Sequence, residues 1–211
     1  AGAGNDTVQV ATANLSTDDT IAGGDGTDVL QLTTATSTVV DADFTNVTGI
    51  ETLQAGSNVD VDITLGALAA AAGVATVNLT GTANNDTDEL ELTAAFTNDL
   101  TVDLDADGNT AAANSVVATN YTKTLTITAA DSDLDTNAST LTGGTGTADE
   151  IQLTIGNLTI AAADMSAITG FEKITTVGNT TATSLAIHSS TVASGKTLTV
   201  DASSMTTTAL T

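Results

Sequence analysis

Residues 23–32 read Gly23-Gly24-Asp25-Gly26-Thr27-Asp28-Val29-Leu30-Gln31-Leu32, a glycine-rich turn that runs directly into a short apolar segment. Leu30 and Leu32 alternate with the polar Gln31, which predicts a β-strand with one buried face. The glycines allow the positive φ angles of a tight turn. The segment therefore predicts one turn followed by one strand, and the same combination recurs along the chain.

Two sets of repeats support this interpretation. The glycine segment returns at Gly143 to Leu153, and in shorter form at Gly2 to Val10. Residues 42–53 return as residues 163–174, an offset of 121 residues. Repeats of this kind indicate stacked structural units. We expect residues 1–20 to end one unit, residues 21–140 to form a full unit and residues 141–211 to form part of a second, in a continuous solenoid without a linker.

Short alternating segments between the glycine turns complete the fold prediction. They lie at residues 59–65, 77–79, 100–104, 125–127, 151–155 and 198–200. Alanine-rich pieces at residues 65–72, 110–117 and 160–168 predict short helical turns. Strands that start about 20–27 residues apart are typical of solenoid coils. We predict a mainly β protein, a parallel β-solenoid of the β-helix or β-roll kind. Repeated β-sandwiches are the alternative, but they usually contain hairpin turns and large aromatics, which are scarce here.

The composition excludes several classes of function. The chain has 211 residues and a net charge of −23, with 26 acidic side chains against three lysines. Such a surface does not bind nucleic acid by neutralising phosphates, nor an anionic membrane face. No apolar run is long enough to enter a membrane as a helix. Without cysteine there are no disulfides or thiolate metal sites. The uncompensated charge must be widely spread or neutralised by bound cations.

The glycine segment also predicts a metal site, because residues 23–31 fit the calcium nonapeptide G-G-x-G-x-D-x-U-x. Glycine carbonyl and aspartate oxygens are the hard ligands that Ca²⁺ prefers. Ordinary glycine and aspartate turns are the alternative. The predicted Ca²⁺ ligands are Gly23, Gly24, Asp25, Gly26 and Asp28, with Gly4, Asn5, Asp6, Gly144, Gly146 and Asp149 in the relaxed copies.

Two further acidic segments are candidate calcium sites. Asp103, Asp105, Asp107 and Asn109 follow the D-x-D-x-D-G pattern of a calcium loop, but Asn114 stands where an EF-hand has its bidentate glutamate. In a segment that we expect to be extended, Asp131, Asp133 and Asp135 alternate, which would place three carboxylates on one edge. A polar strand face that runs into a turn is the alternative interpretation.

These motifs, together with the Thr-, Ala-, Asp- and Gly-rich composition, resemble bacterial surface-layer (S-layer) and related secreted surface proteins with RTX-type calcium repeats. The resemblance is carried by residues 23–32, their copies at Gly2 and Gly143, and residues 43–53 with their copy at residues 164–174. It implies calcium-dependent ordering outside the cell, type I secretion, and assembly of the chain with itself into a lattice or coat. The nonapeptides are sparse and no anchoring module is visible, which is a departure from the family.

The sequence therefore favours a structural, self-assembling protein of the cell surface. A repeat module of a large secreted adhesin, binding a surface or a cell-surface polysaccharide, is the alternative. An enzyme is not expected, because a carbohydrate-active β-helix would usually offer aromatic platforms for sugars, and aromatics make up 2% of this chain.

Overall fold

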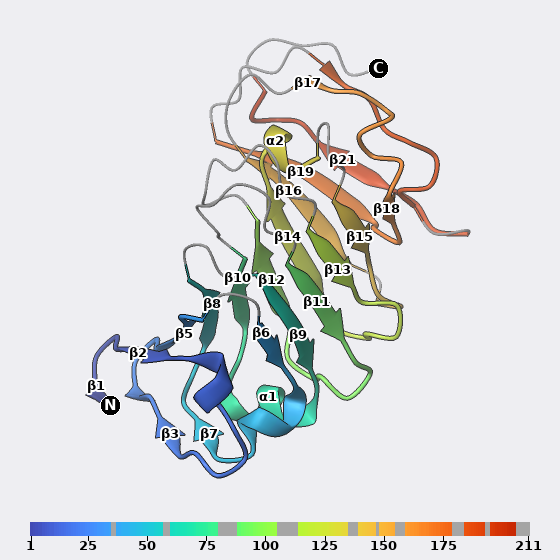
Figure 1. Ribbon diagram of the computed structural model, residues 1–211. Coiled ribbons are helices and arrows are strands. Elements are labelled where there is room, and N and C mark those ends of the chain that lie inside the picture. Colours follow the sequence, from blue (N-terminus) through green and yellow to red (C-terminus); the bar gives the residue numbers. More distant parts are fainter. Residues whose placement is uncertain are drawn as a thin grey trace.

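The computed structural model describes residues 1–34, 37–56, 60–79, 88–104, 114–134, 139–146, 148–154, 159–178, 184–192 and 195–205. The chain winds into a stack of parallel strands, with β2 and β21 at opposite ends of the stack (Figure 1). Every described strand pair is parallel, which confirms the predicted β-solenoid over the β-sandwich. No helix among these residues is long and apolar enough to cross a membrane.

One side of the solenoid is a nine-stranded sheet that receives one strand from each successive coil. Paired residues are separated along the chain by 22 (Thr7 to Val29) to 26 (Lys173 to Thr199) residues, which is the length of one coil. In order, its strands are β2 (Thr7–Val10), β5 (Val29–Leu32), β8 (Thr52–Ala55), β10 (Thr76–Asn78), β12 (Leu100–Asp103), β14 (Leu125–Ala129), β16 (Glu150–Thr154), β19 (Lys173–Val177) and β21 (Thr199–Asp201).

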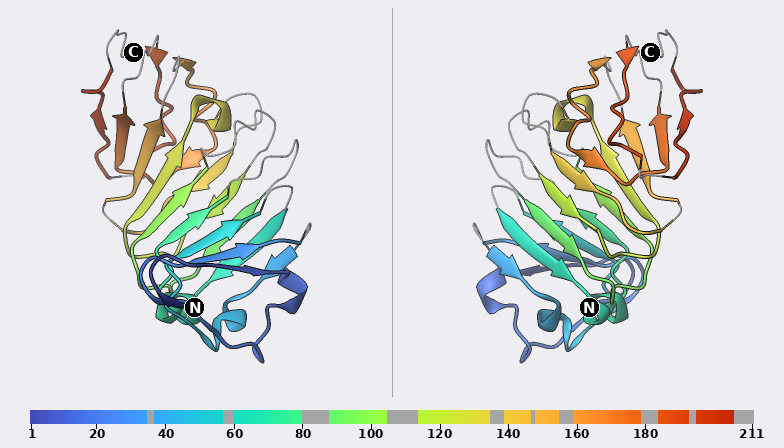
Figure 2. Two further views of the ribbon diagram at one scale, coloured as in Figure 1. Left: turned by 90° about the vertical axis from the view of Figure 1, so that its left-hand side faces the viewer. Right: turned by 90° about the vertical axis from the view of Figure 1, so that its right-hand side faces the viewer.

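A six-stranded sheet forms the facing side, so the middle coils contribute two strands each (Figure 2). Its strands, in spatial order, are β18 (Ile168–Thr169), β15 (Thr140–Thr142), β13 (Ser115–Val117), β11 (Glu89–Leu92), β9 (Val61–Leu65) and β6 (Ser37–Val39). Three short pairs complete the strands: β1 (Gly2–Ala3) with β4 (Gly24–Asp25), β3 (Ile21–Ala22) with β7 (Val47–Thr48), and β17 (Thr159–Ile160) with β20 (Ser184–Leu185).

The described helices are short and lie at corners of the coils. They are α1 (Ala67–Ala72), α2 (Asp131–Leu134) and the 3₁₀ turns η1 (Thr12–Asn14) and η2 (Asp41–Phe44). Asp41 fixes α1, because its carboxylate accepts the backbone N–H groups of Gly66 and Ala69, each at 2.9 Å. Gly73 ends α1 with a φ of 112°, a left-handed conformation that favours glycine.

The core is a set of apolar rows between the two sheets. In the nine-stranded sheet, the inward position is occupied coil after coil by an apolar side chain that is completely buried, namely Leu30, Leu53, Val77, Val102, Ile127, Ile151 and Ile174. Burying one such side chain stabilises the fold by about 1.5–3 kcal/mol. The two ends of this row, Val8 and Val200, are only partly buried.

The helical predictions were correct in one place and wrong in another. The alanine-rich residues 65–72 contain α1 as expected. Of the predicted helical piece 110–117, residues 110–113 lie outside the described residues, and Ser115–Val117 form strand β13 instead, because Val116 pairs with Leu90 and Leu141 in a buried apolar row. Residues 161–167 lie between β17 and β18 and form turns with hydrogen bonds to the third preceding residue, such as Asp164 N–H to Ala161 carbonyl at 3.1 Å.

Candidate functional site

Acidic side chains join neighbouring coils through the backbone. Asp28 stands directly before β5, and its Oδ1 accepts the backbone N–H of Asp6, the matching residue of the preceding coil, at 2.7 Å. Glu51, before β8, accepts the N–H of Asp28 in the same way at 2.8 Å. These contacts, which we call coil-to-coil carboxylate bonds, satisfy partly buried backbone donors.

The second repeat contains an equivalent pair of bonds, whose two carboxylates lie 121 residues after Asp28 and Glu51. Asp149 Oδ1 accepts the N–H of Leu125 at 2.9 Å, and Glu172 Oε2 accepts the N–H of Asp149 at 3.1 Å. The six-stranded sheet repeats the arrangement, because Asp88 accepts the N–H of Val61 at 3.0 Å. The sequence predicted Asp28 and Asp149 as calcium ligands but missed the role of Glu51 and Glu172. The 121-residue recurrence of these glutamates was the available signal.

The structure brings the first two glycine segments together. Strand β1 pairs with β4, so that Gly2 lies opposite Gly24 and Ala3 opposite Asp25. The approach is close enough to require glycine: a Cβ on Gly24, which has a φ of 120°, would lie 1.9 Å from the Gly2 carbonyl oxygen. The predicted ligands Gly4, Asn5 and Asp6 therefore lie one coil below Gly26, Thr27 and Asp28. The copy at Gly144, Gly146 and Asp149 lies several coils away along the solenoid.

The two repeats differ in how completely their aspartate is satisfied. Both oxygens of Asp149 accept backbone N–H groups, from Leu125 and from Gly144 at 2.7 Å. In the first repeat, Asp28 is completely buried, and its Oδ2 has no hydrogen-bond partner among the described residues. Gly23 makes room for this oxygen, since a Cβ there would lie 2.5 Å from it and 1.8 Å from the Gly49 carbonyl oxygen.

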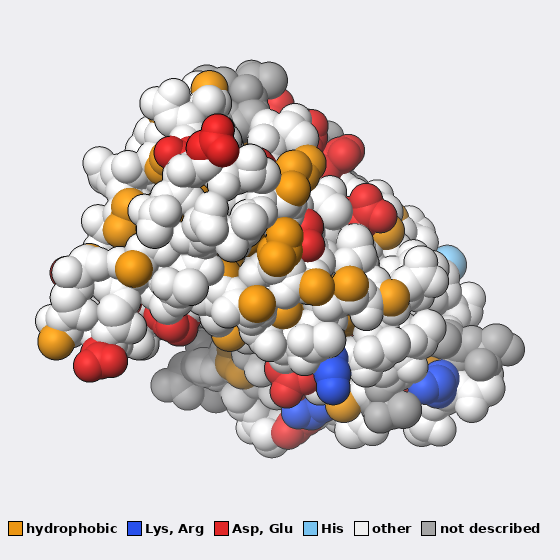
Figure 3. All heavy atoms as spheres, turned by 90° about the horizontal axis from the view of Figure 1, so that it is seen from below, with side chains coloured by type: hydrophobic (Ala, Val, Ile, Leu, Met, Phe, Trp, Pro, Cys, Tyr) orange, Lys and Arg blue, Asp and Glu red, His pale blue; other side chains and the backbone are white. Residues whose placement is uncertain are grey.

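The repeats also differ in local charge. Lys196 Nζ lies 3.8 Å from Glu172 Oε1 and 3.2 Å from the Gly146 carbonyl oxygen, so an ammonium group stands beside the second carboxylate pair. In the first repeat, Glu51 Oε1 lies near Gly73, where a Cβ would lie 3.4 Å from that oxygen. Lysines lie among acidic side chains on the face seen in Figure 3, but neither described ion pair involves Asp28 or Glu51.

Burial changes the proton affinity of Asp149. Burial raises the pKa of Asp149 above 3.8, and the neighbouring Glu172 raises it further, whereas the N–H groups of Leu125 and Gly144 and the charge of Lys196 lower it. The net effect is a raised pKa. Within the described residues, no group of three or more His, Asp or Glu side chains is arranged to hold a metal ion by itself. Any cation site in these turns must therefore combine one or two carboxylates with backbone carbonyl oxygens.

The structure does not bring together the calcium ligands predicted in the two further acidic segments, residues 103–109 and 131–135, as far as it describes them. Asp105, Asp107, Asn109 and Asp135 lie outside the described residues, and Asp103 ends β12 with its side chain half-buried. The prediction of an extended segment around Asp131 and Asp133 was wrong, because residues 131–134 form helix α2. Asp133 is buried and turns back to accept the N–H of Ala130 at 2.7 Å, a local hydrogen bond that favours a turn over a strand.

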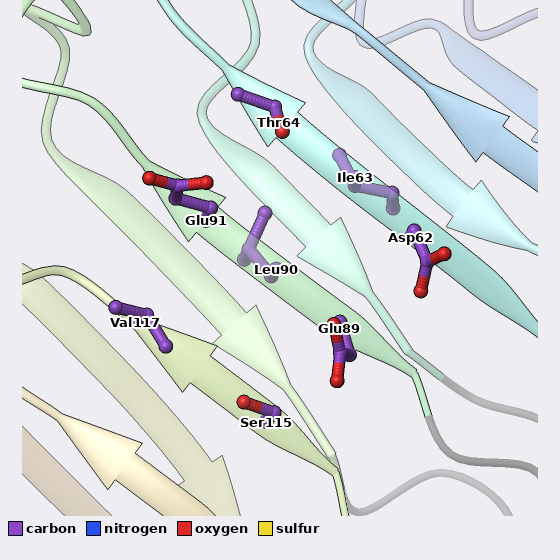
Figure 4. Close-up of a pocket in the computed structure, with 8 residues that line it drawn as sticks. All are labelled: Asp62, Ile63, Thr64, Glu89, Leu90, Glu91, Ser115 and Val117. Atoms are coloured by element: carbon purple, nitrogen blue, oxygen red, sulfur yellow. The ribbon is translucent and has the colours of Figure 1, made fainter.

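A groove of about 330 Å³ lies on the outer face of the six-stranded sheet. Asp62 and Glu89 lie side by side on neighbouring strands in one row, and Glu91 lies beside Thr64 in the next (Figure 4). Like charges in direct opposition across strands are unfavourable. The carboxylates are exposed, and their presence makes the groove acidic. No single stretch of sequence marks this surface, because its members are contributed by separate coils.

Comparisons with known proteins add no relative: no protein-family model matches the chain, and neither the curated proteins nor the solved structures contain a significant match.

Proposed function

We propose that this protein is a structural, self-assembling protein of the cell surface, a subunit of an S-layer lattice or an extracellular filament that calcium orders. The carrying observation is the buried Oδ2 of Asp28, which has no described hydrogen-bond partner although the Glu51 carboxylate accepts the Asp28 backbone N–H, within a chain of net charge −23. A chain of this charge repels itself where cations are scarce and becomes compact where they are plentiful. This property suits export by a type I route and ordering outside the cell.

Calcium is the cation that fits the first repeat. The free, buried Oδ2 of Asp28 is a hard anionic oxygen, and the stacked glycine turns offer backbone carbonyl oxygens nearby. The second repeat supports the same idea, because there the ammonium group of Lys196 supplies a positive charge beside Glu172. Asp28, with Glu51 and the glycine turns, would hold the ion, which would supply the positive charge that the first repeat lacks.

Calcium titration of the purified chain tests this proposal. The midpoint temperature of thermal unfolding should rise in millimolar calcium. A ligand present at 100 times its Kd stabilises the folded state by about 2.7 kcal/mol. Asp28→Asn should lose most of this shift. Asp164→Asn is the matched control, because that carboxylate caps only the N–H of Ala161 at an exposed turn. Identical unfolding and assembly in calcium and in chelator would refute calcium ordering.

A second candidate function, a surface- or glycan-binding module of an adhesin, is favoured by the acidic groove over β9, β11 and β13. Carboxylates such as Asp62 and Glu89 can accept hydrogen bonds from sugar hydroxyl groups. This function predicts binding of immobilised cell-surface polysaccharide that is weakened in Glu89→Gln and Glu91→Gln. Binding that is unchanged in both variants would leave the groove without this role.

A further inference from the structure

Positive and negative charges are divided unevenly along the chain. Residues 1–122 contain 18 of the 26 acidic side chains and neither lysine nor arginine. Residues 123–211 contain the other eight acidic side chains and all three lysines, Lys123, Lys173 and Lys196. The glycine turn before β5 therefore has no lysine in its own part of the chain, whereas the glycine turn before β16 does.

The Lys196 ammonium group lies where two oxygen atoms from different coils converge. Its Nζ is 3.2 Å from the Gly146 carbonyl oxygen and 3.8 Å from Glu172 Oε1. A backbone carbonyl oxygen and a carboxylate oxygen are the types of ligand that Ca²⁺ takes in proteins. The Glu172 side chain is only 10% exposed, and its Oε2 accepts the N–H of Asp149 at 3.1 Å. One oxygen of this carboxylate therefore binds the backbone, and the other faces the ammonium group.

The first repeat has a glycine at the matching position. Lys196 stands three residues before the strand residue Thr199, and Gly73 stands three residues before Thr76. In the preceding coil, these two threonines pair with residues that lie 121 positions apart. A Cβ on Gly73 would lie 3.4 Å from Glu51 Oε1, so Gly73 has the same place beside the glutamate. Because glycine has no side chain, it supplies no charge to that oxygen.

A groove of about 340 Å³ opens beside the ammonium group and is lined by Glu172, Lys196 and Thr197, among other residues. Through this groove, a hydrated cation has a path to the oxygens of Gly146 and Glu172 once the ammonium group is removed. Water molecules in the groove would then fill the remaining ligand positions, which Ca²⁺ accepts.

From these contacts we propose that Lys196 is a tethered cation that takes the place of a metal ion in the second glycine turn. A tethered group acts at an effective concentration set by the chain itself, so it does not vary with the calcium around the protein. Its charge also repels a second cation from the same two oxygens. The second turn is therefore ordered without calcium. The inference rests on the proposed calcium binding at the first turn and assigns the opposite behaviour to the second.

Lys196→Met tests this role, because it keeps an unbranched aliphatic side chain and removes the charge. The substitution is added to an Asp28→Asn chain, whose first turn should no longer respond to calcium. In chelator, Lys196→Met should lower the midpoint temperature of unfolding by about 2–4 °C, and millimolar calcium should restore it. Lys173→Met is the matched control, since it removes the same charge from an ion pair with Glu150 at 3.1 Å. The control should gain no response to calcium.

Tyrosine-sensitised terbium luminescence gives a second readout, which does not need the Asp28 substitution. The Tyr121 carbonyl accepts the N–H of Thr145 at 2.7 Å, so this single tyrosine lies one coil from the second glycine turn and several coils from the first (Figure 1). Lys196→Met in the otherwise wild-type chain should gain the luminescence. Adding Glu172→Gln should remove it, because the amide still accepts the N–H of Asp149 but carries no charge.

Two results would overturn the tethered cation. One is a Lys196→Met chain that unfolds in chelator at the same temperature as its parent, and the other is a loss of stability that calcium does not reverse. A different result bears on the first turn: an Asp28→Asn chain that keeps the full calcium response of wild type would refute binding there. The difference between Lys196→Met and Lys173→Met would still decide the role of Lys196.

Discussion

Asp149 Oδ1 lies 2.9 Å from the backbone nitrogen of Leu125, one coil earlier in the solenoid. The same carboxylate accepts the N–H of Gly144 with its other oxygen. One side chain therefore ties the glycine turn of its own coil to the start of a strand in the coil below. The calcium-type motif in this repeat thus has a structural role that needs no metal ion.

Removing this carboxylate should be costly. In Asp149→Ala the N–H of Leu125 is left buried without a partner and that of Gly144 partly so, and an unsatisfied buried donor costs about 1–3 kcal/mol. We expect the free energy of unfolding to fall by about 2–4 kcal/mol in denaturant titration. Asp25→Ala is the control, because Asp25 is exposed, and it should change stability by about 0.5 kcal/mol or less. Equal effects in the two variants would contradict this role.

The raised pKa of Asp149 makes its contribution depend on pH. The folded state holds this proton more tightly than the unfolded state, whose pKa is near 3.8. The linked stability is therefore fully present below pH 3.8 and is lost as the pH rises through the raised folded pKa. The unfolding free energy of wild type minus that of Asp149→Asn should decrease over this window. A difference that rises with pH there would show that the pKa is lowered instead.

Tyr121 offers a spectroscopic test of burial. It is completely buried beside Phe96, with ring centroids 6.0 Å apart, and its hydroxyl donates to the Asn98 carbonyl. Burial raises its pKa above 10.0, and the charges of Asp99 and Asp149 raise it further. The stability linked to this proton is present below pH 10 and is lost as the pH rises through the folded pKa.

Because Tyr121 is the single tyrosine of the chain, ultraviolet absorbance reports it alone. The native protein should show no phenolate at pH 10, and the signal should appear on unfolding. Tyr121→Phe should lower stability by about 1–2 kcal/mol, since it leaves the Asn98 carbonyl without this donor. A native phenolate titration centred on pH 10 would contradict the buried position.

Gly23 should be the most sensitive glycine for steric reasons. Gly23→Ala would place its Cβ 1.8 Å from the Gly49 carbonyl oxygen, so the two coils would have to separate locally. We expect a loss of about 3 kcal/mol or more. Gly178→Ala is the matched comparison, because it has a φ of 81° but nothing within 4 Å of a Cβ. That variant should lose about 1–2 kcal/mol, the cost of the left-handed φ alone. Similar losses in both variants would exclude the close coil contact.

The sequence by itself determined the solenoid, because its evidence is local. The alternation in residues 29–32 and 100–103 gives strands, the glycines give turns, and the recurrence of residues 42–53 at 163–174 shows that the units stack. Local evidence gave the wrong prediction at residues 115–117, where the alanine-rich neighbouring sequence suggested a helix. Only the buried row shared with Leu90 and Leu141 makes Val116 part of a strand.

The tertiary structure alone decided what the carboxylates do. Asp28 and Asp149 have the same place in the same motif, yet one keeps a buried oxygen without a described partner and the other has both oxygens bonded. Their partners lie one coil away, 22 to 24 residues distant along the chain, and the coil length sets which N–H meets which side chain. The register between coils depends on how all of the coils stack. The motif therefore predicted an acidic turn, but only the stacked structure shows which backbone groups its carboxylate binds.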